Sequence, residues 1–105
     1  MMKFITAIEL KKRMDAGENI CVIDIREPYE YQFCNIGSLH IPMADLASQI
    51  DKLPEKSTKV LMCKSGKRAE ALGNLITVEF GIDVLILEGG ITAWKEEVDN
   101  FLELD

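Results

Sequence analysis

Short apolar runs separated by amphipathic stretches give this chain the pattern of an α/β protein. Continuous apolar segments at residues 20–25, 60–63 and 84–87 predict strands buried on both faces, which is typical of a parallel sheet. Residues 38–41 indicate a weaker strand, and residues 3–5 a weaker one still. Because these runs alternate with helical patterns, we expect an open, parallel, five-stranded sheet with helices on both faces.

Five amphipathic stretches between the apolar runs predict helices. A capping box formed by Thr6 and Glu9 precedes the first, and Gly17 can end it. Glu27-Pro28 can start a short second helix, because proline is tolerated in the first turn. The residues that mark the five helices are Ala7, Leu10 and Met14; Tyr31; Met43, Leu46, Ala47 and Ile50, ending before Pro54; Ala69 to Phe80, ending at Gly81; and Ile91, Trp94 and Val98.

Length and composition are those of one small globular domain, which we expect to span residues 1–105. An apolar fraction of 48% argues against disorder. No run approaches the roughly 18 apolar residues of a membrane span, and the N-terminus lacks the pattern of a signal peptide. Three scattered cysteines argue against a disulfide framework. We therefore expect a cytoplasmic protein without a membrane partner; nothing in the pattern indicates its oligomeric state.

The distribution of charged residues along the chain limits the kinds of ligand that the protein can bind. The net charge is −6, with acids and bases mixed along the chain, which disfavours binding to nucleic acid. The local exception is a basic cluster of Lys64, Lys67 and Arg68. Three clustered cations on an acidic protein indicate a focused site for a small anion.

The segment CKSGKRA combines this basic cluster with a cysteine. Cys63 ends an apolar strand, Gly66 lies in the turn, and a helical pattern begins directly after Arg68. A strand–loop–helix arrangement directs unpaired N–H groups and the positive end of the helix dipole at one point, and this setting favours a thiolate. The segment therefore predicts a nucleophilic sulfur inside an anion-binding loop.

Two other segments are expected at the same edge of the sheet. Asp24 and Arg26 end one predicted strand, and Gly89 and Gly90 follow another. In open α/β sheets, ligands bind beyond the carboxyl ends of the strands, where Cys63 also lies. Asp24 and Arg26 either form a structural ion pair at the strand end or support the site, with Arg26 at its mouth and Asp24 orienting the loop.

Four motifs together resemble the rhodanese (sulfurtransferase) family, over roughly residues 4 to 100. They are VIDIREPYEY, IGSLHIP, CKSGKRA and VLILEGGITAW, in the order that the family has them. Cys34-Asn35-Ile36 stands where the commoner form has Gly-His-Ile. With GGITAW and a trailing Glu-Val-Asp, this variant resembles the rhodanese domain at the C-terminus of molybdopterin- or thiamine-pathway adenylyltransferases. Here the domain is expected to stand alone.

The resemblance implies a thiosulfate:cyanide type of sulfurtransferase that needs no metal or other cofactor. Cys63 would take a sulfane sulfur from a donor such as thiosulfate, carry it as a persulfide, and pass it to a thiol, cyanide or a protein. Loop N–H groups would hold the transferred sulfur and the departing sulfite. The residues implied for anion binding are Lys64, Ser65, Gly66, Lys67 and Arg68.

Several alternatives remain. The same chemistry would suit a sulfur carrier that accepts persulfide from a cysteine desulfurase and delivers it to a ubiquitin-like sulfur-carrier protein. A cysteine phosphatase fits less well, because the loop has four residues between Cys63 and Arg68 where phosphatases have five, and no general acid is evident. A role in glutathione redox chemistry ranks last, because no second cysteine stands in a C-x-x-C pattern to resolve a mixed disulfide.

The remaining candidate residues have ordinary structural interpretations. Cys21 lies within an apolar strand and Trp94 on the last helix, so both are expected in the core. Nothing in the sequence places Cys34 near Cys63 as a resolving thiol. His40 is the lone histidine and precedes Pro42 in a strand-like run. We therefore expect the nucleophile to depend on loop dipoles and cations rather than on a histidine.

Overall fold

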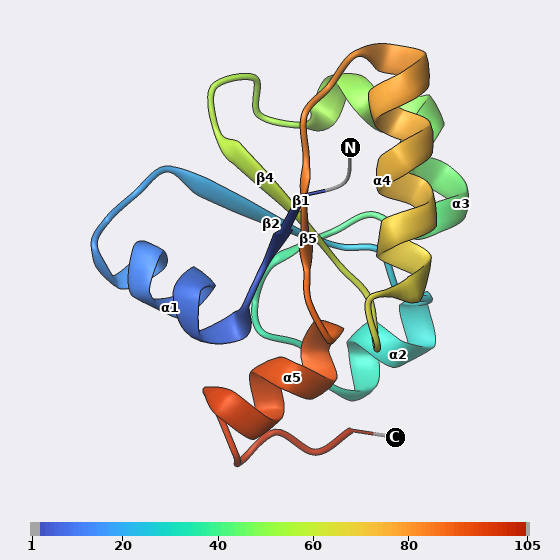
Figure 1. The fold of residues 1–105 in the computed structure, drawn as a ribbon. Helices are drawn as coiled ribbons and strands as arrows, with labels where there is room; N and C mark the ends of the chain where they lie inside the picture. Colours follow the sequence, from blue (N-terminus) through green and yellow to red (C-terminus); the bar gives the residue numbers. More distant parts are fainter. Residues whose placement is uncertain (1–2, 105) are drawn as a thin grey trace.

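A computed structural model describes residues 3–104, which form one parallel sheet with helices around it (Figure 1). The elements in chain order are β1 (Lys3–Ile5), α1 (Ala7–Asp15), β2 (Ile20–Asp24), α2 (Pro28–Phe33), β3 (Leu39–His40), α3 (Met43–Leu46), the 3₁₀ helix η1 (Ala47–Lys52), β4 (Thr58–Met62), α4 (Lys67–Phe80), β5 (Leu85–Leu87) and α5 (Gly90–Glu97). All five predicted strands are present.

The sheet has the strand order β1-β5-β4-β2-β3, and every neighbouring pair is parallel. β4 lies at its centre, where Val60 pairs with Val22 of β2 and Leu61 pairs with Ile86 of β5. Successive residues of a strand point to opposite faces, and the last four residues of β4 are all buried. This central position confirms the prediction of a strand covered on both sides and carries Cys63 to the carboxyl edge.

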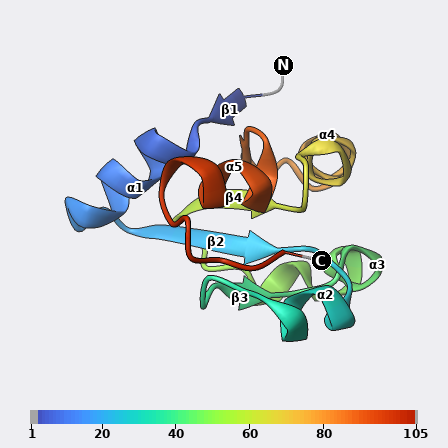
Figure 2. The ribbon, with the colours of Figure 1, turned by 90° about the horizontal axis from the view of Figure 1, so that it is seen from below.

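Helices cover both faces of the sheet, as the sequence predicts. On one face α1 and α5 form a core with the sheet that includes Leu10, Ile91 and Trp94. On the other face the core includes Leu46 of α3 and two residues of α4, Leu72 and Ile76. Figure 2 shows α1 and α5 on one side and α3 and α4 on the other. Trp94 is 7% exposed, which confirms its place in the core.

The helix ends mostly follow the sequence signals. Thr6 accepts a hydrogen bond from the Glu9 N–H at 3.1 Å, and Gly81 ends α4 with a φ of 66°. The predicted third helix is instead an α-helix, α3, followed directly by the 3₁₀ helix η1, and Gln49 inside η1 leaves helical geometry at φ −117°. Apolar spacing of three or four residues suits both an α-helix and a 3₁₀ helix, so the pattern could not reveal this tightening. None of the helices within residues 3–104 is long and apolar enough to span a membrane.

Candidate active site

The loop after β4 surrounds the sulfur of Cys63 with backbone donors. Gly66 donates its N–H to Sγ at 3.0 Å, and Ala69, in the first turn of α4, donates at 3.4 Å. The loop can turn this tightly because Gly66 has a φ of 101°, a region that residues with a side chain rarely adopt. The resemblance implied that the amides of residues 64–68 hold the transferred sulfur; the donors to Sγ itself are the amides of Gly66 and Ala69.

Backbone dipoles are directed at the sulfur. The two N–H groups are part of the unpaired set at the start of α4, where the helix dipole is positive. Cys63 is 0% exposed, so Sγ has few competing hydrogen bonds from water. No basic side chain within residues 3–104 is hydrogen-bonded to it. Among the described residues, the hydrogen bonds to the sulfur therefore come from backbone amides. Of the cations that the sequence also suggests, Arg68 interacts with Cys63 through its charge, without a hydrogen bond.

Arg68 joins this loop to α2 through a residue that the sequence analysis did not single out. Its Nη1 and Nη2 donate to Glu30 Oε1 and Oε2 at 2.8 and 3.1 Å. Glu30 Oε1 also accepts the N–H of Glu27 at 3.0 Å, which completes a capping box at the start of α2. Glu30 is 5% exposed, and a buried glutamate requires such partners. The pair holds the first turn of α4 against α2.

The ion pair also fixes the charge of both groups. The hydrogen bond from Arg68 is the main reason that the pKa of Glu30 falls from 4.5 to about 2; burial opposes this shift, and the N–H of Glu27 adds to it. The same hydrogen bond raises the pKa of Arg68. Glu30 therefore stays ionised at neutral pH and neutralises much of the positive charge that Arg68 was expected to offer an anion.

The start of α5 holds the outer side of the cysteine loop. The N–H groups of Ile91 and Thr92 donate to the carbonyl oxygens of Cys63 and Lys64 at 2.9 and 3.2 Å. Gly90 lies so close that a Cβ on it would be 2.3 Å from the Cys63 oxygen and 2.5 Å from the Lys64 oxygen. With these carbonyls held by α5, the neighbouring amides are free to turn toward Sγ.

Asp24 and Arg26 form a buried ion pair at the end of β2. Arg26 Nη2 donates to Asp24 Oδ2 at 2.9 Å and to the backbone oxygen of Cys34. Arg26 Nε and its backbone N–H both donate to Asp24 Oδ1 at 3.0 Å. With exposures of 0% and 1%, the two side chains have no open face toward solvent. This geometry is that of a structural ion pair, and it also ties the Cys34 backbone to the end of β2.

The other predicted loop residues differ in exposure. Ser65 and Lys67 are exposed, whereas Lys64 is half-buried and takes part in a polar interaction of its own. The two lysines lie on either side of the Gly66 turn, Lys64 in the loop and Lys67 as the first residue of α4. They add positive charge around the site.

None of the three other candidate side chains is hydrogen-bonded to the sulfur within residues 3–104. The ring of His40 stacks on Tyr31, with 4.3 Å between centroids, and its Nε2 donates to the backbone oxygen of Arg26 at 2.9 Å. Cys34 and Cys21 are half-buried free thiols. Cys21 packs against the core, and this burial raises its pKa, although Lys59 partly offsets the effect.

Replacing Glu30 with glutamine should lower the free energy of unfolding by about 1–2 kcal/mol at pH 7, since Arg68 is one-third exposed and partly screened by water. A carboxylate with a lowered pKa stabilises the fold above its ordinary pKa and loses that effect as the pH falls toward the folded value. The difference between wild type and Glu30→Gln should therefore shrink as the pH falls from 4.5 to about 2. Urea unfolding across this range measures it.

The exposed Glu79 provides the control for this experiment. Glu79→Gln should change stability by less than about 0.5 kcal/mol, as surface substitutions usually do. A Glu30→Gln deficit that stays constant from pH 7 to acid would contradict the ion-pair explanation, because it would mean that the loss comes from packing rather than charge.

Comparison with known proteins agrees with this geometry. The family of the rhodanese-like domain matches residues 6–97. "Probable adenylyltransferase/sulfurtransferase MoeZ" of Mycobacterium tuberculosis is 39% identical over 98 residues; the match covers 90% of this chain but only 25% of that protein. The sulfurtransferase of Allochromatium vinosum is 32% identical over 96 residues, covering 90% of this chain and 89% of that one. A rhodanese-related protein of Thermoplasma volcanium has a similar structure, with a TM-score of 0.82 and 28% identity over 98% of this chain and 99% of that one. The chain therefore belongs to the rhodanese-like domain family.

Proposed function

We propose that this protein is a sulfurtransferase that carries sulfur as a persulfide on Cys63. The observation that carries the proposal is that Cys63 Sγ accepts hydrogen bonds from the N–H groups of Gly66 and Ala69 at the start of α4. Two of the relatives described above carry the word sulfurtransferase in their names, which supports the same chemistry.

In the first half-reaction, the Cys63 thiolate attacks the outer sulfur of thiosulfate. A bond forms between Sγ and that sulfur as its bond to the sulfonate sulfur breaks, and sulfite leaves with the electron pair. In the second half-reaction, cyanide or an acceptor thiolate attacks the outer sulfur and regenerates the Cys63 thiolate. A covalent intermediate of this kind gives ping-pong kinetics.

The loop amides are proposed to stabilise charge in both half-reactions. Negative charge moves from Sγ to the outer sulfur and to the leaving sulfite, and preorganised N–H donors stabilise such developing charge. Because Glu30 already binds Arg68, the main task of Arg68 is to fix the loop against α2. Sγ is buried, so the donor gains access through a local rearrangement of the loop.

Intact-mass spectrometry before and after incubation with thiosulfate tests the proposal. We expect the protein to gain the mass of one sulfur atom, to lose it on treatment with cyanide, and to gain nothing when Cys63 is replaced by serine. A sulfur adduct that forms equally on the Cys63→Ser variant would contradict the assignment, since the sulfur would then reside on Cys21 or Cys34.

A sulfur-carrier role differs from this proposal in its partners and not in its chemistry. Slow turnover with thiosulfate, together with rapid loading by a cysteine desulfurase, would favour the carrier. An absence of loading from both donors would contradict the persulfide function altogether.

A further inference from the structure

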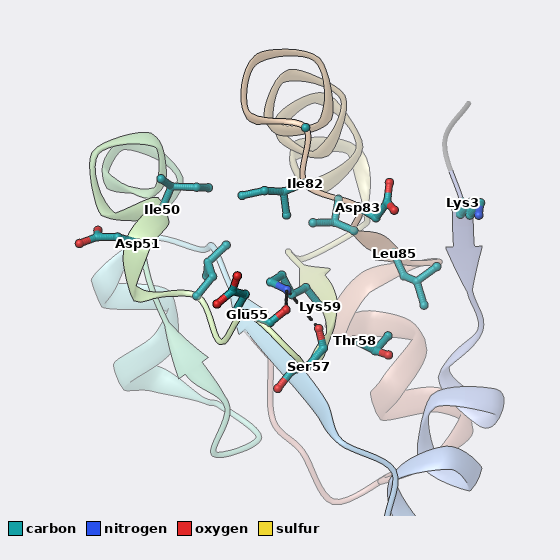
Figure 3. A pocket seen from close by; sticks show the side chains of 13 residues that line it. Lys3, Ile50, Asp51, Glu55, Ser57, Thr58, Lys59, Ile82, Asp83 and Leu85 are labelled. Carbon is teal, nitrogen blue, oxygen red and sulfur yellow. Dashed lines mark hydrogen bonds between the residues drawn. The ribbon is translucent and has the colours of Figure 1, made fainter.

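A groove of about 820 Å³ lies at the edge of the sheet opposite to the cysteine loop. It is bounded by the starts of β1, β4 and β5, by the end of η1 and by the segment after α4 (Figure 3). Its volume is in the range of small-molecule sites. Lys59 follows Thr58, the first residue of β4, and Cys63 follows Met62, the last. Four residues of extended strand therefore separate Lys59 from Cys63, which is about 13 Å.

Lys59 is the buried charge of this groove. It is 9% exposed, and its Nζ donates to the backbone oxygens of Glu55 and Ser57 at 3.2 and 3.1 Å. An ammonium group has three N–H donors. No carboxylate within residues 3–104 forms an ion pair with Lys59, although Glu55 lines the same groove. A buried cation is costly without an anionic partner, and within the described residues one N–H of this ammonium group and its charge have no direct partner.

The groove provides apolar surface next to this ammonium group. Leu53 and Val84, each 7% exposed, line it together with Lys59. In Figure 3 the side chains of Ile50 and Ile82 point toward one another from opposite walls. A ligand with a short hydrocarbon chain can cover these side chains while its head group reaches Lys59, which is the usual combination of apolar lining and a few placed polar groups.

The rim of the groove restricts the charge of the ligand. Three exposed acids, Asp51, Glu55 and Asp83, line it, against one exposed lysine, Lys3. A second negative charge on the ligand would be repelled by these carboxylates, whereas a single carboxylate close to Lys59 is attracted at short range. The arrangement therefore favours one negative charge over two.

We propose that this groove binds a small monocarboxylate with an apolar chain, and that the carboxylate pairs with the Lys59 ammonium group. Most ligands of open α/β sheets bind at the carboxyl edge of the strands, where the cysteine loop lies. The groove lies at the opposite edge and is therefore a second, separate site. The inference does not depend on the sulfur-transfer function.

Hexanoate is the probe, and amide NMR spectra of the wild-type protein measure its binding. We expect saturable shifts confined to residues of the groove such as Thr58 and Val84. Hexanamide, which has the same length and no charge, should bind at least about tenfold more weakly, because a charge-assisted hydrogen bond is roughly twice as strong as a neutral one and the ion pair is lost. Adipate, with a second carboxylate, should also bind more weakly than hexanoate.

Two lysine variants localise the effect. Lys59→Met keeps an unbranched apolar side chain of similar length and removes the charge, and it should abolish the preference for hexanoate over hexanamide. Lys56→Met makes the same change at an exposed lysine and should leave that preference unchanged. Equal affinity of wild type for hexanoate and hexanamide, or shifts that never saturate, would overturn the proposal even if Lys59→Met failed to fold.

Discussion

Replacing Cys63 with serine should reduce sulfur transfer by at least about a thousandfold, as expected when the nucleophile of a covalent mechanism is removed. Serine keeps an oxygen that can accept the N–H bonds of Gly66 and Ala69, so the loop should keep its shape. The loss is chemical, because a hydroxyl needs a general base to become a nucleophile and no base is hydrogen-bonded to Cys63 within residues 3–104. The initial rate of thiocyanate formation from thiosulfate and cyanide measures the effect.

Stability measurements separate this chemical loss from a folding defect. Cys63 lies in the core, so its serine variant should unfold in urea with a free energy that is lower by about 1–2 kcal/mol and still cooperatively. Cys34→Ser is the control, because Cys34 is a half-buried free thiol that is not hydrogen-bonded to the loop sulfur. Near-normal transfer by Cys63→Ser, or its loss in Cys34→Ser, would contradict the assigned nucleophile.

The sequence predicts the fold and the cysteine loop because the signals for both lie in short, continuous segments of the chain. Apolar runs such as residues 60–63 indicate buried strands by their length alone, and the order of strands and helices then limits the topology. The segment from Cys63 to Arg68 combines a strand end, a turn glycine and a helix start within a few residues. Such a signal does not depend on contacts with distant parts of the chain.

The contacts that hold the loop in place could not be predicted in this way. Glu30 lies 38 residues before Arg68, and its sequence context resembles that of an ordinary capping residue in a short helix. A signal was present, since the position three residues after Glu27 is where a capping box places an acid. Nothing local shows that the same carboxylate also binds an arginine of α4. The glycine pair at residues 89–90 is visible in the sequence, but the carbonyls against which Gly90 packs are not.

The close approach of Gly90 makes it the second residue at which a small change should have a large effect. A methyl group there would lie 2.3 Å from the Cys63 oxygen and 2.5 Å from the Lys64 oxygen, and both contacts are with backbone atoms. Gly90 also has a φ of +61°, which costs a residue with a side chain about 1–2 kcal/mol. Relieving the overlap requires α5 and the cysteine loop to separate, which would stretch the hydrogen bonds from Ile91 and Thr92.

Gly90→Ala should therefore lower the free energy of unfolding by about 3 kcal/mol or more, as the conformational cost adds to that of overpacking. Sulfur transfer by the folded fraction should fall by about a hundredfold, because a displacement of about 1 Å in a catalytic group has an effect of that size. Urea unfolding and steady-state transfer rates, both measured on the same preparation, give the two quantities.

Gly37→Ala separates the steric cost from the conformational one. Gly37 has a φ of +76°, similar to that of Gly90, but a Cβ there would meet nothing within 4 Å. This variant should lose only the conformational part, about 1–2 kcal/mol, and should transfer sulfur normally. If Gly90→Ala were no more harmful than Gly37→Ala, α5 would not hold the cysteine loop in position, and the orientation of the amides toward Sγ would have to arise within the loop itself.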